Sequence, residues 1–143
     1  MILYINTTSH YEIVIALFKD GVFKTAVDFN DKSRLIGRQR INAPRCQAEK
    51  LLPAINRLLK TKKIKLSALK KVIVANRGGS FTSLRIGVIT ANALAYALKI
   101  PVEAELRSVK KNKKFASYSI VEPLYDREPT IGISKKTLNN YKK

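Results

Sequence analysis

The chain has 143 residues, of which 45% are hydrophobic, and it carries 28 Lys or Arg against 10 Asp or Glu. This is the size of one ordinary domain with its own core. One cysteine, Cys46, and one histidine, His10, exclude a disulfide framework and metal sites that need several of either residue. No apolar run approaches the roughly 20 residues of a membrane helix, and Ile2 to Ile5 is too short for a secretory signal. We therefore expect a cytoplasmic protein that needs no membrane.

The net charge of +18 has two explanations. Lys and Arg displace condensed counterions from a polyanion, which makes nucleic acid the first candidate partner. Lys also outnumbers Arg roughly two to one in a chain rich in Ile and Asn, which is typical of an AT-rich coding bias. The basic runs at 60–71, 110–114 and 135–143 lack the interleaved apolar face of a helix that binds a membrane surface.

The first thirty residues predict three strands. Ile2 to Ile5 and Ile13 to Phe18 are continuous apolar runs, typical of strands covered on both faces. Asp20-Gly21 is typical of a hairpin turn, and the alternating segment Val22 to Phe29 predicts an edge strand. Asp31 to Arg45 is polar and has no clear period, so we expect a loop or a ragged helix start there.

The middle of the chain predicts a helix followed by a buried strand. From Gln47 to Lys60 the apolar residues recur at helical spacing, and Pro53 inside this stretch indicates a late start or a kink. The apolar run Val72 to Ala75 is typical of a central strand parallel to the first one. Residues 76–82 then lead into a second helix that runs to about Leu98.

The alternating segment Val102 to Leu106 predicts the second edge strand. Two buried strands, a buried fourth and alternating third and fifth strands fit one α/β mixed sheet in the order 3-2-1-4-5 with two main helices. This is the ribonuclease-H-like sheet, shared by nucleases and by each half of the actin-like ATPases. We expect residues 1–106 to form this domain. Residues 107–143 then form a basic linker, a short strand at 117–121 and an extended tail along the domain.

The sequence shows no residue pattern that is typical of an enzyme active site. A nuclease on this sheet needs carboxylates that hold two divalent metal ions, but the first strand ends in Asn6 and the first helix has Glu49 as its one acid. His10 is the one imidazole base, and no spacing ties it to a Ser, Thr or Cys nucleophile. We expect neither a metal nor a catalytic residue.

A glycine-rich loop precedes the second helix and is a candidate anion-binding site. Unpaired amides at a helix N-terminus hold phosphate or carboxylate, and arginines nearby would add positive charge. The same glycines also serve where a strand and a helix pack closely, and Ser80 also serves as a helix cap. The candidate residues are Arg77, Gly78, Gly79, Ser80 and Arg85.

The second helix is apolar around roughly 260° of its circumference, whereas a helix on a sheet needs about 100°. Another element must cover the rest, and the candidates are the first helix, the tail or a second protein chain. We favour a partner laid across both helices. The residues predicted to face it are Leu51, Ile55, Leu58, Gly87, Val88, Ala91, Ala95 and Leu98.

Several motifs resemble one known family. Ser80 to Gly87 reads Ser-Phe-Thr-Ser-Leu-Arg-Ile-Gly and is similar to Gly-Ser-Phe-Thr-Gly-Leu-Arg-Ile-Gly of the TsaB (YeaZ) family. The opening Ile-Leu-Tyr-Ile-Asn-Thr-Thr-Ser and the closing Pro-Leu-Tyr-Asp-Arg-Glu-Pro at 123–129 resemble the family's two ends. Departures are Asn6 for Asp, Gln47 for His, Arg77-Gly78 for Gly-Pro, and Ser83 for Gly. We also expect the Lys-rich linker at 110–114 to stand in place of the family's second subdomain.

The resemblance implies a non-catalytic subunit of the machinery that makes threonylcarbamoyladenosine in tRNA. Such a subunit pairs through its two helices with the paralogue TsaD, which holds the metal and transfers the threonylcarbamoyl group. TsaE and tRNA complete the assembly, and a homodimer is expected when TsaD is absent. Two alternatives remain: a stand-alone basic RNA-binding domain, and a nucleotide-binding relic that uses Gly78-Gly79.

Overall fold

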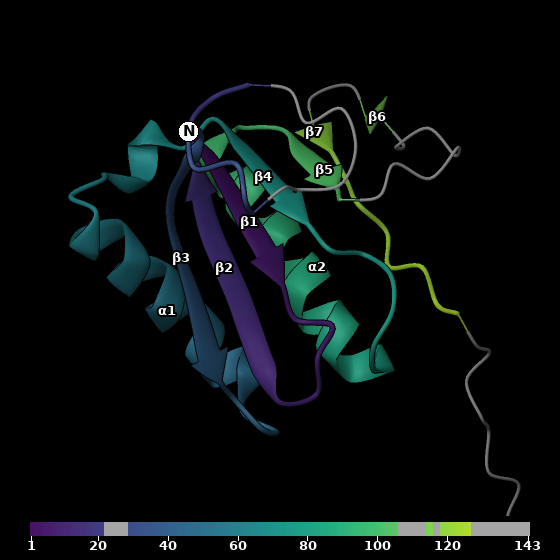
Figure 1. Cartoon of the computed structure of the whole chain (residues 1–143). Helices are drawn as coiled ribbons and strands as arrows, with labels where there is room; N and C mark the ends of the chain where they lie inside the picture. Colours follow the sequence, from purple (N-terminus) through teal and green to yellow (C-terminus); the bar gives the residue numbers. More distant parts are fainter. Residues whose placement is uncertain (22–28, 106–113, 116–117, 127–143) are drawn as a thin grey trace, which may run out of the picture.

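Five strands form one sheet in the computed structural model, which describes residues 1–21, 29–105, 114–115 and 118–126 (Figure 1). Their order is β3-β2-β1-β4-β5, which confirms the predicted sheet. β1 runs antiparallel to β2 and parallel to β4, and β5 runs parallel to β4. The strands are β1 (Ile2–Asn6), β2 (Glu12–Phe18), β3 (Leu35–Asn42), β4 (Lys71–Val74) and β5 (Val102–Ala104).

The third strand is not where the sequence predicted it. Residues 22–28, most of the expected strand, lie outside the described residues. β3 instead occupies part of the segment 31–45, so the prediction of a loop or helix start there was wrong. Its polar composition has a physical reason, because β3 is an edge strand whose Arg38 and Arg40 are exposed while Ile41 is half-buried. Antiparallel pairing with β2 over its whole length stabilises it.

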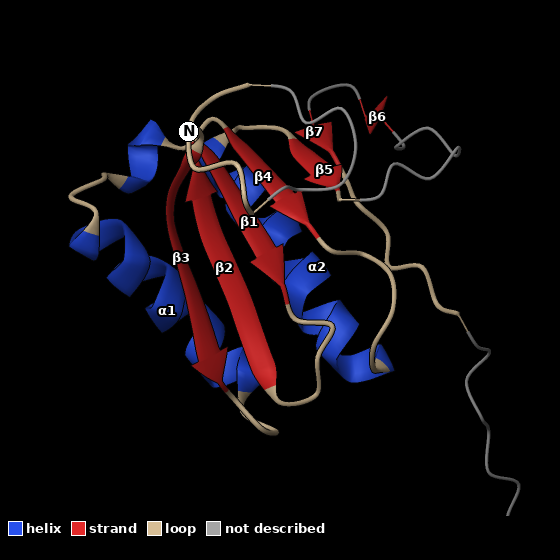
Figure 2. Ribbon diagram, in the orientation of Figure 1, coloured by secondary structure: helices blue, strands red, loops and turns tan. Residues whose placement is uncertain are grey.

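Two helices cover the same face of the sheet (Figure 2). α1 (Gln47–Thr61) begins at Gln47 and continues through Pro53, so the prediction of a late start was wrong. A short 3₁₀ helix, η1 (Leu66–Ala68), leads from it to β4. α2 (Phe81–Leu98) has the predicted end, with Lys99 in the left-handed conformation after it.

The core lies between the sheet and these helices. Alternate residues of each strand point to opposite faces, so Leu3, Ile5 and Ile15 join the helix side. Ile2, Tyr4, Ala16, Phe18 and Ile73 form a second buried cluster on the other face. Both faces of the central strands are therefore buried, as their continuous apolar runs predicted.

Within the described residues, α2 is the helix whose length and composition would allow it to cross a membrane. Its mean hydropathy is 1.3 over 18 residues, so the statement that no run approaches membrane length was too strong. α2 packs on the sheet through one stripe of buried residues, and 33% of its length is buried. That arrangement is typical of a core helix in an α/β domain.

The C-terminal segment, of which residues 114–115 and 118–126 are described, lies along α2 and β5. β6 (Lys114–Phe115) and β7 (Tyr118–Ser119) pair as a short hairpin, and the Ser119 hydroxyl accepts a hydrogen bond from the Val102 amide at 3.1 Å. The side-chain amide of Asn92 both donates to and accepts from the backbone of Val121, at 2.9 and 3.0 Å. Val121 is buried, so this contact adds to the core. The boundary between a 1–106 domain and its tail stays a prediction.

Candidate functional site

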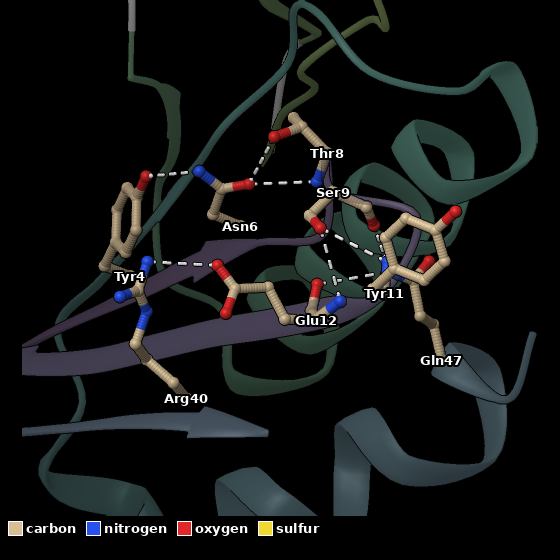
Figure 3. Close-up of polar contacts among 8 residues, drawn as sticks. All are labelled: Tyr4, Asn6, Thr8, Ser9, Tyr11, Glu12, Arg40 and Gln47. Atoms are coloured by element: carbon tan, nitrogen blue, oxygen red, sulfur yellow. Dashed lines mark hydrogen bonds and ion pairs between the residues drawn. The ribbon is translucent and has the colours of Figure 1, made fainter. Parts of the chain in front are cut away.

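Asn6 occupies the end of β1, and both the oxygen and the nitrogen of its side-chain amide form hydrogen bonds (Figure 3). Its carbonyl oxygen accepts hydrogen bonds from the Thr8 amide at 2.9 Å and the Thr8 hydroxyl at 2.8 Å. Its Nδ2 donates to the Tyr4 hydroxyl at 3.1 Å. The residue therefore shapes the turn after β1.

A buried phenol and carboxyl lie beside Asn6. The Tyr4 hydroxyl donates to Glu105 Oε2 at 2.9 Å, which links β1 to the chain just after β5. Burial raises the pKa of Tyr4, and the nearby Glu105 charge raises it further. Burial also raises the pKa of Glu105, while the Tyr4 hydrogen bond opposes that shift. The pair is a structural contact between two strands of the sheet.

Gln47 at the start of α1 holds the turn between β1 and β2 (Figure 3). Its side-chain Nε2 donates to the carbonyls of Ser9 at 2.5 Å and Glu12 at 3.2 Å. The side chain is buried, so these bonds satisfy an amide that would be costly to leave unpaired. Gln47 thereby fixes α1 against the sheet.

In the glycine-rich loop before α2, backbone conformation explains Gly78, and backbone conformation together with close packing explains Gly79. Gly78 and Gly79 have φ angles of 83° and 78°, which favour glycine. A Cβ on Gly79 would overlap the Thr8 carbonyl, so the loop lies directly on the turn after β1. The Ser80 hydroxyl accepts a hydrogen bond from the Ser83 amide at 3.1 Å and caps α2. Backbone conformation, close packing and helix capping therefore explain Gly78, Gly79 and Ser80 without a bound anion.

The two arginines of the candidate anion site contact the C-terminal segment. Arg77 forms an ion pair with Asp126 at 2.8 Å, and Arg85 donates to the Tyr125 hydroxyl at 2.9 Å. The Tyr125 ring stacks on Phe81 with centroids 4.2 Å apart. A carboxylate of the chain itself thus occupies Arg77, and anion binding by this loop stays a prediction.

The predicted partner-facing residues point toward the sheet. Seven of them are buried inside the domain, including Ala91 at 0% and Leu51 at 1% exposure. Gly87 belongs to this inner side, because a Cβ there would meet the Thr7 hydroxyl, which itself donates to the Ser83 carbonyl at 2.6 Å. The prediction chose the wrong side of each helix. The seven are Leu51, Ile55, Leu58, Gly87, Val88, Ala91 and Ala95, while Leu98 is half-buried.

The outward side of α2 is also apolar. Ile89 is 64% exposed and Tyr96 is 69% exposed, and Ala93 and Ala97 between and beside them are exposed as well. These residues recur three, four and seven positions apart, so they share one face of the helix. Leu52 on α1 is 52% exposed. We call these five residues the outer apolar stripe.

A cleft of about 710 Å³ separates the N-terminal parts of α1 and α2. Ala48 of α1, Ile86 of α2 and Tyr11 of the turn after β1 line it, so the two helices expose one continuous surface there. Among the residues that the structure describes, His, Cys, Asp and Glu form no group of three that would hold a metal ion.

Comparisons with known proteins match this chain to a TsaD family model and to TsaB and YeaZ proteins. A family model described as TsaD, tRNA N6-adenosine threonylcarbamoyltransferase, matches residues 41–104. The tRNA threonylcarbamoyladenosine biosynthesis protein TsaB of Bacillus subtilis (strain 168) is 29% identical over 122 residues, 83% of this chain and 47% of that protein. The structure of YeaZ from Pseudomonas aeruginosa matches with a TM-score of 0.59 and 27% identity over 72% of this chain and 42% of its own.

A second Pseudomonas aeruginosa structure, an uncharacterized protein with similarity to peptidase YEAZ, has a TM-score of 0.59 and 28% identity. The match covers 72% of this chain and 41% of that structure's chain. Together these comparisons support assignment of the chain to the TsaB (YeaZ) family. This TsaB-type chain spans about half the length of the Bacillus relative.

The TsaB motif at 80–87 has a clear structural role in this chain. Ser80 caps α2, the Ser83 carbonyl accepts the Thr7 hydrogen bond, and Gly87 lets α2 approach β1 closely. The motif therefore fixes α2 on the sheet. The exposed Ile89 and Tyr96 were missed as site residues, although their spacing of seven on an apolar helix was a usable signal.

Proposed function

We propose that this chain is a non-catalytic scaffold subunit of tRNA threonylcarbamoyladenosine synthesis. It pairs with TsaD through the outer apolar stripe and thereby supports threonylcarbamoyl transfer to a tRNA adenosine. Family membership supports the pathway, because the Bacillus relative is named for this biosynthesis. The exposed apolar side of α2 is the observation that carries the pairing.

The outer apolar stripe fits a helix-to-helix interface. Ile89 is exposed by about two thirds on this helix face, and an exposed apolar side chain of that size is typical of a protein–protein contact when others lie beside it. Ala93 between Ile89 and Tyr96, and Ala97 beside Tyr96, leave room for a partner helix to approach. Leu52 extends the apolar surface to α1. The same surface would form a homodimer when TsaD is absent.

The end of β1 supports a non-catalytic role. Asn6 offers no charge to a metal ion, and both atoms of its amide are used within the chain. His10 is exposed, its ring 6.2 Å from that of Tyr11. Catalysis then belongs to TsaD, and TsaE and tRNA would join the pair in the cytoplasm.

Capture by the cognate TsaD tests the proposal. Purified full-length chain is mixed with TsaD and the complex is resolved by size exclusion, and tRNA modification is then measured with and without the chain. We expect a stable complex and modification that depends on this chain. A chain that binds tRNA tightly but neither binds TsaD nor affects modification would instead be a stand-alone RNA-binding domain.

A further inference from the structure

Six exposed lysines gather at one end of the sheet. This is the end where β1, β4 and β5 begin and where α1 and α2 finish, near the N-terminus in Figure 1. The Lys19 amide bonds the Arg34 carbonyl at 2.9 Å, and the Lys70 amide bonds the Met1 carbonyl at 2.8 Å. We call this set the lysine rim; its members are Lys19, Lys62, Lys63, Lys65, Lys70 and Lys99.

The rim differs from the opposite end of the sheet in how its charges are paired. Within the described residues, Lys70 pairs with Asp20 at 3.4 Å and the neighbouring Lys71 pairs with Glu103 at 2.8 Å, whereas the other five lysines of the rim have no ion pair. At the opposite end nearly every cation has a partner inside the chain. Those contacts are Arg40 with Glu12, Arg77 with Asp126, Arg85 with Tyr125, and Lys50 with the Asn42 carbonyl.

Helix stabilisation explains only part of the rim. Lys62 and Lys99 follow the last turns of α1 and α2, where positive charge interacts favourably with the helix dipole. Lys19, Lys65 and Lys70 lie in the connections outside both helices, where no helix end needs them. Like charges close together repel, so their concentration costs folding energy unless a ligand supplies negative charge.

We propose that the lysine rim is a contact surface for the phosphate backbone of RNA, with tRNA the RNA class that the proposed function supplies. Lysine is a compact, strongly hydrated point charge that pairs with phosphate without shape-specific contacts. A protein partner would require a buried apolar centre. Lys99 lies beside Tyr96 of the outer apolar stripe, but around the other five lysines the described residues offer one large exposed apolar side chain, Leu66 at 44%, which is too little for such a centre.

Charge reversal at two rim positions tests the inference. The rim variant carries Lys19→Glu and Lys65→Glu, both at exposed loop positions. The matched control carries Arg45→Glu and Lys50→Glu beside the start of α1, an equal change in net charge at the other end. Unmodified tRNA binding by the full chain is measured by fluorescence anisotropy across a salt series, with vesicles of anionic phospholipid in parallel.

We expect the rim variant to bind tRNA about tenfold more weakly near 0.1 M salt, with its log–log salt slope shallower by about two, while the control keeps the parent slope. Equal losses in both variants would overturn the inference, because the attraction would then be diffuse. If the parent chain did not bind tRNA, the inference would also be overturned. The same holds if the parent chain bound anionic vesicles as tightly as tRNA and the rim variant lost that vesicle binding.

The inference rests on the proposed function for its choice of RNA, and TsaD capture separates the two. The rim variant should still bind TsaD, because the outer apolar stripe is unchanged. A chain that binds TsaD but not tRNA would end the inference and leave the scaffold role standing. A chain that binds tRNA through the rim but does not bind TsaD would support the inference and contradict the scaffold role.

Discussion

The two sides of α2 both carry apolar residues, yet the sheet buries only the inner side. The inner side carries Gly87, Ala91 and Ala95, which bring the helix close to β1 and β4. The outer side carries Ile89 and Tyr96. A helix that only covers a sheet normally has bulky apolar residues inside and polar residues outside. Here the inner side is apolar and buried, as expected, but the outer side also exposes apolar residues, which the proposed contact with TsaD would cover.

A charge on the inner side should have the largest effect. Ala91 is fully buried against the sheet, so Ala91→Glu would place an unpaired carboxylate in the core. We expect the free energy of unfolding to fall by at least about 4 kcal/mol, which most small domains do not survive. Urea denaturation followed by circular dichroism measures it.

Ala93→Glu is the matched control, because Ala93 lies two residues away on the exposed side of the same helix. Its stability should stay within about 0.5 kcal/mol of the parent. If Ala91→Glu were as stable as Ala93→Glu, the assignment of an inner and an outer side of α2 would be wrong.

The contact of the C-terminal segment with α2 should have an intermediate effect. Tyr125→Ala removes the ring stacked on Phe81 and the hydrogen bond from Arg85, and we expect a loss of about 1 kcal/mol. Tyr125→Phe keeps the ring and should lose less than half of that. Equal losses in the two variants would mean that the hydroxyl alone holds this segment. Thermal unfolding of the three proteins gives the comparison.

The buried Tyr4–Glu105 contact should give the smallest effect, which appears as a pH dependence. Burial raises the folded-state pKa of Glu105 above its ordinary 4.5, so the folded chain holds this proton to a higher pH than the unfolded chain does. Its contribution to stability is fully present below pH 4.5 and is lost as pH rises through the raised value. Glu105→Gln should remove this decline. Unchanged pH dependence in the variant would contradict the assignment.

Local patterns predicted most of the fold. β1, β2 and β4 are continuous apolar runs, and α1 has a clear helical period, so these elements could be located from their own residues. β3 could not, because Arg38 and Arg40 face solvent and its position is set by pairing with β2. Pairing between strands far apart in sequence leaves little trace in a polar edge strand.

The site was harder to predict than the fold. The apolar arc of α2 correctly indicated more apolar surface than a sheet can cover, but a helical wheel does not say which side faces the sheet. Here Gly87 decides it, because only a small residue fits against Thr7. The contacts of Arg77 and Arg85 with Asp126 and Tyr125 join residues about 40 to 50 positions apart, which no local motif encodes.

The affinity of TsaD for an Ile89→Glu variant tests the scaffold account most directly. Ile89 is 64% exposed, so the variant should fold like the parent, and a charge within the outer apolar stripe should weaken TsaD binding at least about thirtyfold. Leu66→Glu serves as the control, because Leu66 is an exposed apolar residue away from α1 and α2. Isothermal titration with parent-like affinity for Ile89→Glu would contradict the account.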